Sequence, residues 1–194
     1  MSLAHACRIV LLGPPGAGKG TQAERLARRL GIPHISTGAI LRAEAARGTD
    51  LGRRAAALME RGELVPDDVV LEIVQARLEQ ADCRPGFILD GFPRSLAQAQ
   101  ALERECGIDA AGLRVLSIEV PVPELVQRMV LRGRKDDREE VIRARLDVYR
   151  QQTEPLISFY REREALVPID GLGTADEVFE RMMARLGSCD GRAS

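Results

Sequence analysis

Hydrophobic and polar positions divide the chain into two alternating kinds of segment. The first kind is a short, almost wholly apolar run bounded by glycine, proline or an acidic residue, which is typical of a buried strand in a parallel sheet. The clearest case, residues 8–12, leads straight into a glycine-rich loop. We predict strands over residues 8–12, 32–35, 86–89, 113–120 and 166–169.

The second kind of segment is longer and carries apolar residues at helical spacing. In residues 21–30, Ala23, Leu26, Ala27 and Leu30 fall on one face. A long charged stretch over 138–164 is also helical in pattern, with a bend expected near Pro155. We predict further helices over 40–46, 51–61, 66–81, 95–105, 123–131 and 175–186. Strands that alternate with helices predict an α/β fold, a five-stranded parallel sheet with helices on both faces.

Composition narrows the function classes. The 194 residues suit one domain, and a net charge of −1 argues against a nucleic-acid or membrane partner. No apolar run reaches the roughly 18 residues that a membrane span needs. The four cysteines form no CxxC pair and no zinc-type spacing, so we expect reduced thiols, no zinc, and a cytoplasmic protein.

The glycine-rich loop, GPPGAGKGT over residues 13–21, predicts a phosphate site. Gly13 and Gly18 stand five apart and Lys19 follows. The glycines allow backbone N–H groups to converge on phosphate oxygens, and the next helix adds its positive N-terminal end. Lys19 supplies a charge for the β- and γ-phosphates. The general motif has Ser or Thr directly after the lysine, whereas here Gly20 precedes Thr21.

Four further motifs follow in order. They are STGAILR over 36–42, DGFPR over 90–94, RGRKDD over 132–137 with Arg145 beyond it, and DGLG over 170–173. Together with GPPGAGKGTQAE they resemble the adenylate kinases of the short-lid bacterial kind, over about residues 8 to 186. The resemblance implies a P-loop NTPase fold in a single kinase domain, usually monomeric. Its core would be 1–35, 66–130 and 138–194, with an NMP-binding insert over 36–65 and a lid over 131–137.

The resemblance also implies the site residues of reversible, Mg²⁺-dependent phosphoryl transfer from ATP to AMP. Asp90 would hold the Mg²⁺ that accompanies ATP, through water. The ATP-binding residues would be Gly16, Ala17, Gly18, Lys19, Gly20, Thr21, Arg128, Arg132 and Gly173. The AMP-binding residues would be Thr37, Arg42, Glu63, Leu64, Val65, Gly91, Phe92, Pro93, Arg94, Gln98, Arg134 and Arg145. The catalytic residues would be Lys19, Arg94, Arg128, Arg132, Arg134 and Arg145.

Elementary chemistry agrees with these roles. Two anionic nucleotides must be brought together, and phosphoryl transfer needs positioning and charge neutralisation more than a strong base. The two histidines, His5 and His34, are isolated in sequence, so we expect structural or surface roles for them. Asp136 and Asp137 either orient the lid arginines or form a solvated charge run. The family usually has Asp where Ala39 stands, so we expect any difference from the family in the packing or capping of that helix.

Two alternatives remain open. The related UMP/CMP kinases usually carry Ala at the position of Thr37, and the Gln98 amide can pair with the N6 amine and N1 of adenine, so both residues favour AMP. A non-catalytic P-loop nucleotide sensor would need the loop but no second nucleotide site. The retained Arg42, Arg94, Arg134 and Arg145 argue against the sensor. The expected partners are therefore ATP and AMP alone.

Overall fold

The computed structural model describes residues 7–134 and 137–187, and its centre is a five-stranded parallel sheet. The strand order is β2-β3-β1-β4-β5. The strands are β1 (Cys7–Leu12), β2 (His34–Ser36), β3 (Gly86–Asp90), β4 (Arg114–Glu119) and β5 (Leu166–Asp170). All strands run parallel, so their carboxyl ends meet at one edge of the sheet, and the predicted fold class is confirmed. Among the described residues no helix is long and apolar enough to cross a membrane.

Helices cover both faces of the sheet because successive residues of each strand point to opposite sides. In β1, Val10 and Leu12 enter one apolar cluster, whereas Ile9 and Leu11 enter the other. The first cluster is closed by α4 (Asp67–Leu78), α5 (Leu96–Cys106) and α8 (Pro155–Arg161). The second is closed by α1 (Lys19–Leu30), α6 (Val122–Arg132), α7 (Glu139–Val148) and α9 (Ala175–Leu186).

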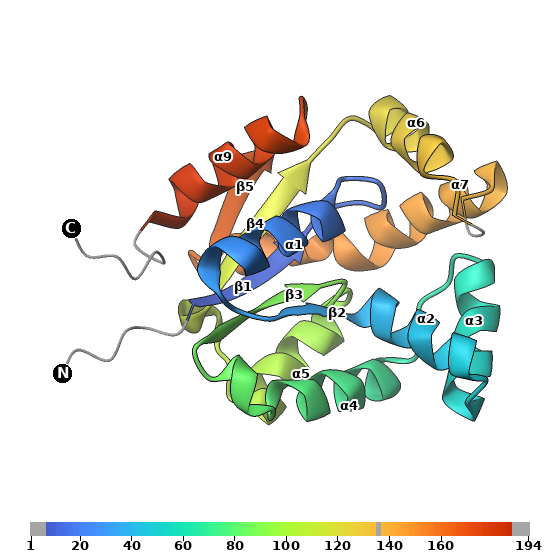
Figure 1. The fold of residues 1–194 in the computed structure, drawn as a ribbon, viewed down its shortest axis with the longest axis horizontal. Helices are drawn as coiled ribbons and strands as arrows, with labels where there is room; N and C mark the ends of the chain where they lie inside the picture. Colours follow the sequence, from blue (N-terminus) through green and yellow to red (C-terminus); the bar gives the residue numbers. More distant parts are fainter. Residues whose placement is uncertain (1–6, 135–136, 188–194) are drawn as a thin grey trace.

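Two helices, α2 (Thr37–Arg47) and α3 (Asp50–Glu60), form a hairpin beside the sheet. Figure 1 shows this hairpin and the α6–α7 pair at the same end of the molecule. The hairpin is tight: a Cβ added to Gly52 would lie 2.2 Å from the backbone carbonyl of Glu44. Only glycine allows this approach, so Gly52 fixes the packing of α3 on α2.

The start of α2 differs from the sequence prediction. The helix begins at Thr37 rather than at residue 40, because the Ser36 side chain accepts a hydrogen bond of 3.4 Å from the Ala39 backbone N–H. A serine N-cap of this kind is a strong helix start. Helix α2 is therefore capped by Ser36, although Ala39 stands where the family usually has Asp.

The long helical stretch expected over 138–164 is divided. Helix α7 ends at Val148, a π-helical turn follows over Tyr149–Thr153, and α8 begins at Pro155. Proline has no N–H to donate to the preceding turn, and the wider turn absorbs the mismatch. The bend predicted near Pro155 is therefore present, as an interruption. Short 3-10 turns over Ala81–Cys83 and Ala110–Gly112 complete the described fold.

Candidate active site

A wide cleft opens where the parallel strands end. The phosphate loop follows β1, Asp90 ends β3, and Ser36 ends β2. Every basic residue that the resemblance assigns to phosphate lines this single cleft, although they come from separate parts of the chain. These residues are Lys19, Arg42, Arg94, Arg128, Arg132, Arg134 and Arg145. A concave wall with this much positive charge is suited to polyphosphate.

The phosphate loop has the backbone that its glycines predicted. Gly16 and Gly18 have φ of +85° and +92°, in the left-handed region that favours glycine. A Cβ at Gly16 would also lie 2.8 Å from the carbonyl oxygen of Leu125. The loop delivers the chain into α1, whose first residue is Lys19. Backbone N–H groups at this helix start are therefore directed into the cleft, where they can bind an anion.

Lys19 is held in the loop by its own backbone. Its Nζ donates hydrogen bonds to the carbonyl oxygens of Gly13, at 2.6 Å, and Pro14, at 3.0 Å. Burial lowers the pKa of Lys19 to about 8; Asp90 opposes the shift, whereas Arg94 and other arginines add to it. The ammonium lies in a site that already carries excess positive charge, so an incoming phosphate relieves that repulsion.

Asp90 ends β3 in the wall of the cleft. His34 Nε2 lies 3.3 Å from its Oδ2. Burial raises the pKa of Asp90, but the His34 hydrogen bond and the charge of Lys19 outweigh it, so the pKa falls below its usual value. His34, expected to have only a structural or surface role, thus contacts a predicted site residue. The strand pairing brings them together, since Ser36 of β2 lies beside Asp90 in the sheet.

The donor atoms near Asp90 fit a cation that arrives with a nucleotide. In the part of the chain that the structure describes, no group of three or more His, Cys, Asp or Glu side chains could hold a metal. Mg²⁺ in nucleotide enzymes is commonly bound by one or two carboxylates together with substrate phosphates and waters. The ionised carboxylate of Asp90 and the hydroxyl of Thr21 both line the cleft beside the phosphate loop.

Asp137 joins the predicted lid arginines. Its side chain is 1% exposed, and it accepts hydrogen bonds from Arg132 Nε and Nη2 at 2.9 and 2.6 Å. Arg145 Nη1 lies 3.3 Å away, and the backbone N–H of Arg134 donates at 3.0 Å. Burial raises the pKa of Asp137, but the Arg132 and Arg134 hydrogen bonds outweigh it and hold the pKa below its usual value. Asp137 thus holds the side chains of Arg132 and Arg145 and the backbone of Arg134, while Asp136 lies outside the described residues.

A first pocket adjoins the cleft beside α2 and shares Arg42, Arg94 and Arg145 with it. Sequence reasoning did not single out its apolar wall of Leu41, Met59 and Val70, because apolar residues at helical spacing also fit a core. The other predicted AMP-binding residues that line it are Thr37, Glu63, Leu64, Val65, Gly91 and Gln98. We call this space the acceptor pocket.

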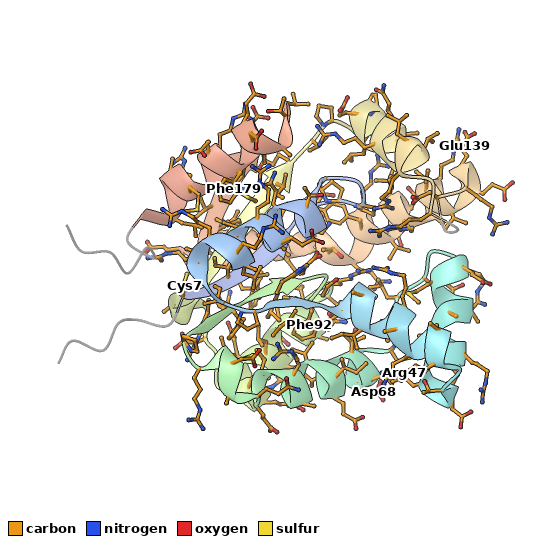
Figure 2. The ribbon with its side chains drawn as sticks, viewed as in Figure 1. Cys7, Arg47, Asp68, Phe92, Glu139 and Phe179 are labelled. Carbon is orange, nitrogen blue, oxygen red and sulfur yellow. The ribbon has the colours of Figure 1, made fainter. Side chains whose placement is uncertain are left out.

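Hydrogen bonds fix the polar side chains of the acceptor pocket. The Gly91 carbonyl oxygen accepts from Thr37 Oγ1 and from Arg94 Nε, both at 2.9 Å. Burial and the neighbouring Arg42 lower the pKa of Arg94, against the effect of Asp90. Phe92, predicted to touch AMP, is 1% exposed and packs in the core below the sheet (Figure 2). Pro93 lines the space between the acceptor pocket and the phosphate loop.

A second pocket lies between α1, α6 and α9. We call it the donor pocket. Arg128 forms its wall, with Nε 2.8 Å from Glu124 Oε1 and Nη2 3.1 Å from the carbonyl oxygen of Gly171. Glu124 and Thr174 also line it and were not predicted, since neither belongs to a motif. The predicted ATP-binding residues that line it are Ala17, Gly18, Thr21, Arg128 and Gly173; Gly16 and Gly20 lie in the adjoining cleft.

Comparison with known proteins decides the family. The family model described as adenylate kinase matches residues 11–165. The chain belongs to the adenylate kinase family. It is 53% identical to an adenylate kinase of Thermus thermophilus over 186 residues, covering 92% of this chain and 96% of the relative.

Other bacterial relatives agree. An adenylate kinase of Mycobacteroides abscessus is 51% identical over 93% of this chain and 99% of its own length. Adenylate kinase 1 of a Nostoc species is 50% identical over the same shares. The resemblance drawn from the motifs is therefore confirmed, and with it the prediction of a nucleoside monophosphate kinase. An adenylate kinase handles two nucleotides, and the acceptor pocket and the donor pocket both adjoin the same basic cleft.

Proposed function

We propose that this chain transfers the γ-phosphoryl group of ATP directly to AMP and so forms two ADP, reversibly. The observation that carries the proposal is the single cleft lined by every predicted phosphate-binding cation and flanked by two separate pockets. A nucleotide sensor would need only one pocket. In-line transfer needs both phosphates in one positively charged space, which this arrangement supplies.

ATP would bind with its base and ribose in the donor pocket and its phosphates on the loop. The backbone N–H groups of Gly16 to Thr21 would surround the β-phosphate, and Lys19 would leave its carbonyl partners for the phosphate oxygens. Arg128 lines both the donor pocket and the cleft, so it can contact the ribose side and the phosphates. Arg132, fixed by Asp137, would complete the triphosphate site.

AMP would bind with its phosphate between Arg42 and Arg94 and its base near Gln98. Thr37 donates its hydroxyl proton to Gly91, so toward a base it can only accept a hydrogen bond. Arg134 and Arg145 would lie between the two nucleotides, where charge develops on the transferred group. No general base is required, because the transition state is loose and the attacking phosphate oxygen is already ionised.

Mg²⁺ is the expected cofactor, bound to the ATP phosphates, where it neutralises charge on the transferred group. Asp90 would orient the waters of the metal through its ionised carboxylate. Residues 36–65 and the lid 131–137 would close over the substrates, because water in the cleft would compete with AMP for the phosphoryl group. A monomer in the cytoplasm is also proposed, on the family resemblance and the cysteine pattern.

A comparison of acceptors tests the proposal. Purified protein is incubated with ATP and Mg²⁺ and with AMP, CMP, UMP or dTMP in turn, and diphosphate formation is measured. The proposal expects AMP to give the highest kcat/KM. A preference for UMP or CMP would instead assign the chain to that related activity. If Arg94→Ala turned over ATP and AMP as fast as the unmodified protein, the acceptor assignment would fail.

A further inference from the structure

Asp67 is the first residue of α4 and lies outside the motifs that resemble the family. Its two carboxylate oxygens have different partners. Oδ2 accepts a hydrogen bond of 2.8 Å from Ser95 Oγ, and Oδ1 accepts one of 2.6 Å from Gln98 Nε2. The Ser95 bond fixes the carboxylate, so that its second oxygen is directed at the Gln98 amide.

The Gln98 amide is held at both ends. While Nε2 donates to Asp67, Oε1 accepts a hydrogen bond of 2.7 Å from the backbone N–H of Arg94. The side chain is buried, and it lines the acceptor pocket. If the amide flipped, its oxygen would face a carboxylate and its NH₂ would face an N–H donor. Because both contacts would then be repulsive, the network permits only one orientation.

One orientation leaves one hydrogen-bonding pattern for a ligand. An amide has two hydrogens and two lone pairs, and the protein uses one of each. The remaining N–H and the remaining lone pair match a base edge that accepts at N1 and donates at the 6-position, as adenine does. Hypoxanthine and guanine have the reverse pattern, a donor at N1 and an acceptor at the 6-position.

We infer that Asp67 is a positioning residue that locks the Gln98 amide in the orientation that selects 6-amino over 6-oxo purines. The inference rests on the proposed function, because it takes the acceptor base to lie against Gln98. Asp67 touches no substrate and acts through Gln98. Only Pro66 separates Asp67 from residues 63–65, so its contact with Gln98 connects the end of the proposed acceptor insert to α5.

The test uses Asp67→Asn in the full chain, with AMP and IMP as acceptors. Asparagine keeps the shape of the side chain but can either donate or accept, so a flipped Gln98 is opposed by the Arg94 N–H alone. The preference for AMP over IMP, as a ratio of kcat/KM values, should fall by about tenfold, the effect of one hydrogen-bond mismatch. The KM for AMP should rise, while the KM for ATP and kcat stay nearly unchanged.

Asp68→Asn is the matched control. It removes the same charge from the same helix start, but Asp68 is exposed and its carboxylate accepts only from the N–H of Val69 among the contacts described (Figure 2). This variant should keep the AMP/IMP ratio. An unchanged ratio in Asp67→Asn, or an equal fall in both variants, would overturn the inference.

Gln98→Leu separates the inference from the proposed function. If AMP turnover is unaffected by this change, the base does not lie against Gln98 and the acceptor assignment fails. If Gln98→Leu raises the KM for AMP but Asp67→Asn leaves the AMP/IMP ratio unchanged, only the lock fails. If a variant fails to fold, an NMR measurement on the unmodified protein still tests the inference. One Gln98 Nε2 proton should be shifted downfield and protected from exchange. Two ordinary, rapidly exchanging protons would overturn the inference.

Discussion

The Nζ of Lys19 lies 2.6 Å from the carbonyl oxygen of Gly13, the residue that opens its own loop. Without nucleotide, two backbone carbonyls and the charge of Asp90 thus compensate an ammonium group among arginines. Phosphate oxygens are stronger partners than these carbonyls, because they carry full charge. The affinity of the free protein for ATP should therefore depend on whether Lys19 is protonated.

The pH dependence of ATP use follows from this contact. Because burial lowers the pKa of Lys19 to about 8, the free protein loses the charge as pH rises through that value. We expect kcat/KM for ATP to fall above pH 8. Bound triphosphate stabilises the ammonium, so kcat should stay level to higher pH. Initial rates from pH 6.5 to 9.5 measure both, and a flat kcat/KM for ATP across that range would contradict the role of Lys19.

The buried charge of Lys19 also predicts a trade between stability and activity. Removing it in Lys19→Met should raise the melting temperature, because burial disfavours the protonated side chain in the folded state. Activity should fall by at least about a hundredfold, the typical loss when one donor to a transition-state charge is removed. Thermal unfolding and the kinase assay on the same sample measure the two effects. A variant that is both less stable and fully active would refute this reading.

Substitution of Asp137 should lower kcat and stability more than substitution of an exposed acidic residue nearby. Asp137→Ala leaves Arg132 without its two-point partner and removes a contact of Arg145, so kcat should fall about ten- to a hundredfold, in line with a misplaced charge clamp. Loss of this partly exposed ion pair should also lower the free energy of unfolding, by about 1–3 kcal/mol, because charged groups lose their partners. Denaturant titration and steady-state kinetics measure these effects.

Glu139→Gln is the control for Asp137→Ala, because the exposed Glu139 pairs only with exposed Arg143 among the contacts described (Figure 2). It should change neither kcat nor stability measurably. Equal kinetic effects of the two variants would contradict the proposed role of Asp137.

The stability that Asp137 contributes should depend on pH. Because the pKa of Asp137 is held below its usual value, this contribution is present at neutral pH and is lost as pH falls through that lowered pKa.

A side chain at Gly91 should weaken the binding of AMP without weakening that of ATP. A Cβ there would lie 2.8 Å from Thr37 Oγ1 and 2.9 Å from Arg94 Nη2, at a backbone φ of +84°. Gly91→Ala should therefore raise the KM for AMP about tenfold or more, because small displacements in a positioned site have large effects, and leave the KM for ATP nearly unchanged. Gly107→Ala, at φ +63° with no atom within 4 Å of the new Cβ, controls for backbone strain. A rise in the KM for AMP in both variants would attribute the effect to strain.

Substitutions at Arg42 and Arg128 should each affect the KM of a different substrate. Arg42 lines the acceptor pocket and Arg128 the donor pocket, while both reach the cleft. Arg42→Ala should raise the KM for AMP about tenfold, and Arg128→Ala the KM for ATP by a similar factor, each with little effect on the other substrate. Full two-substrate kinetics measure the four constants. If Arg42→Ala instead raised the KM for ATP and Arg128→Ala the KM for AMP, the two pockets would have to be assigned the other way round.

The sheet and most of the helices could be predicted because their signals are local. Short apolar runs indicate the strands, and the glycines of the phosphate loop occur where positive φ is needed. One boundary was missed where a side chain decides it, since Ser36 caps α2 three residues before the predicted start. The bend in the stretch from 138 to 164 was predicted near Pro155, whose effect is local, but the π-helical form of the turn was not.

The site was predictable only as far as motifs reach. All of the basic residues except Arg128 were named from motifs, and the fold brings them together in one cleft. The contacts that hold Gln98 and Asp90 were not predicted, since Asp67 meets Gln98 across 31 positions and His34 meets Asp90 across 56. Such pairings depend on strand order and helix packing, which spacing along the chain does not encode. For the same reason Phe92, inside a motif, proves to be a core residue.

The fate of the γ-phosphate tests the central claim most directly. ATP labelled at the γ-position is incubated with AMP, Mg²⁺ and the purified protein, and the labelled products are separated. The account predicts that the label appears in ADP, that one AMP disappears for each ATP, and that label in inorganic phosphate stays at background. Label released as inorganic phosphate at a rate independent of AMP would contradict transfer between nucleotides.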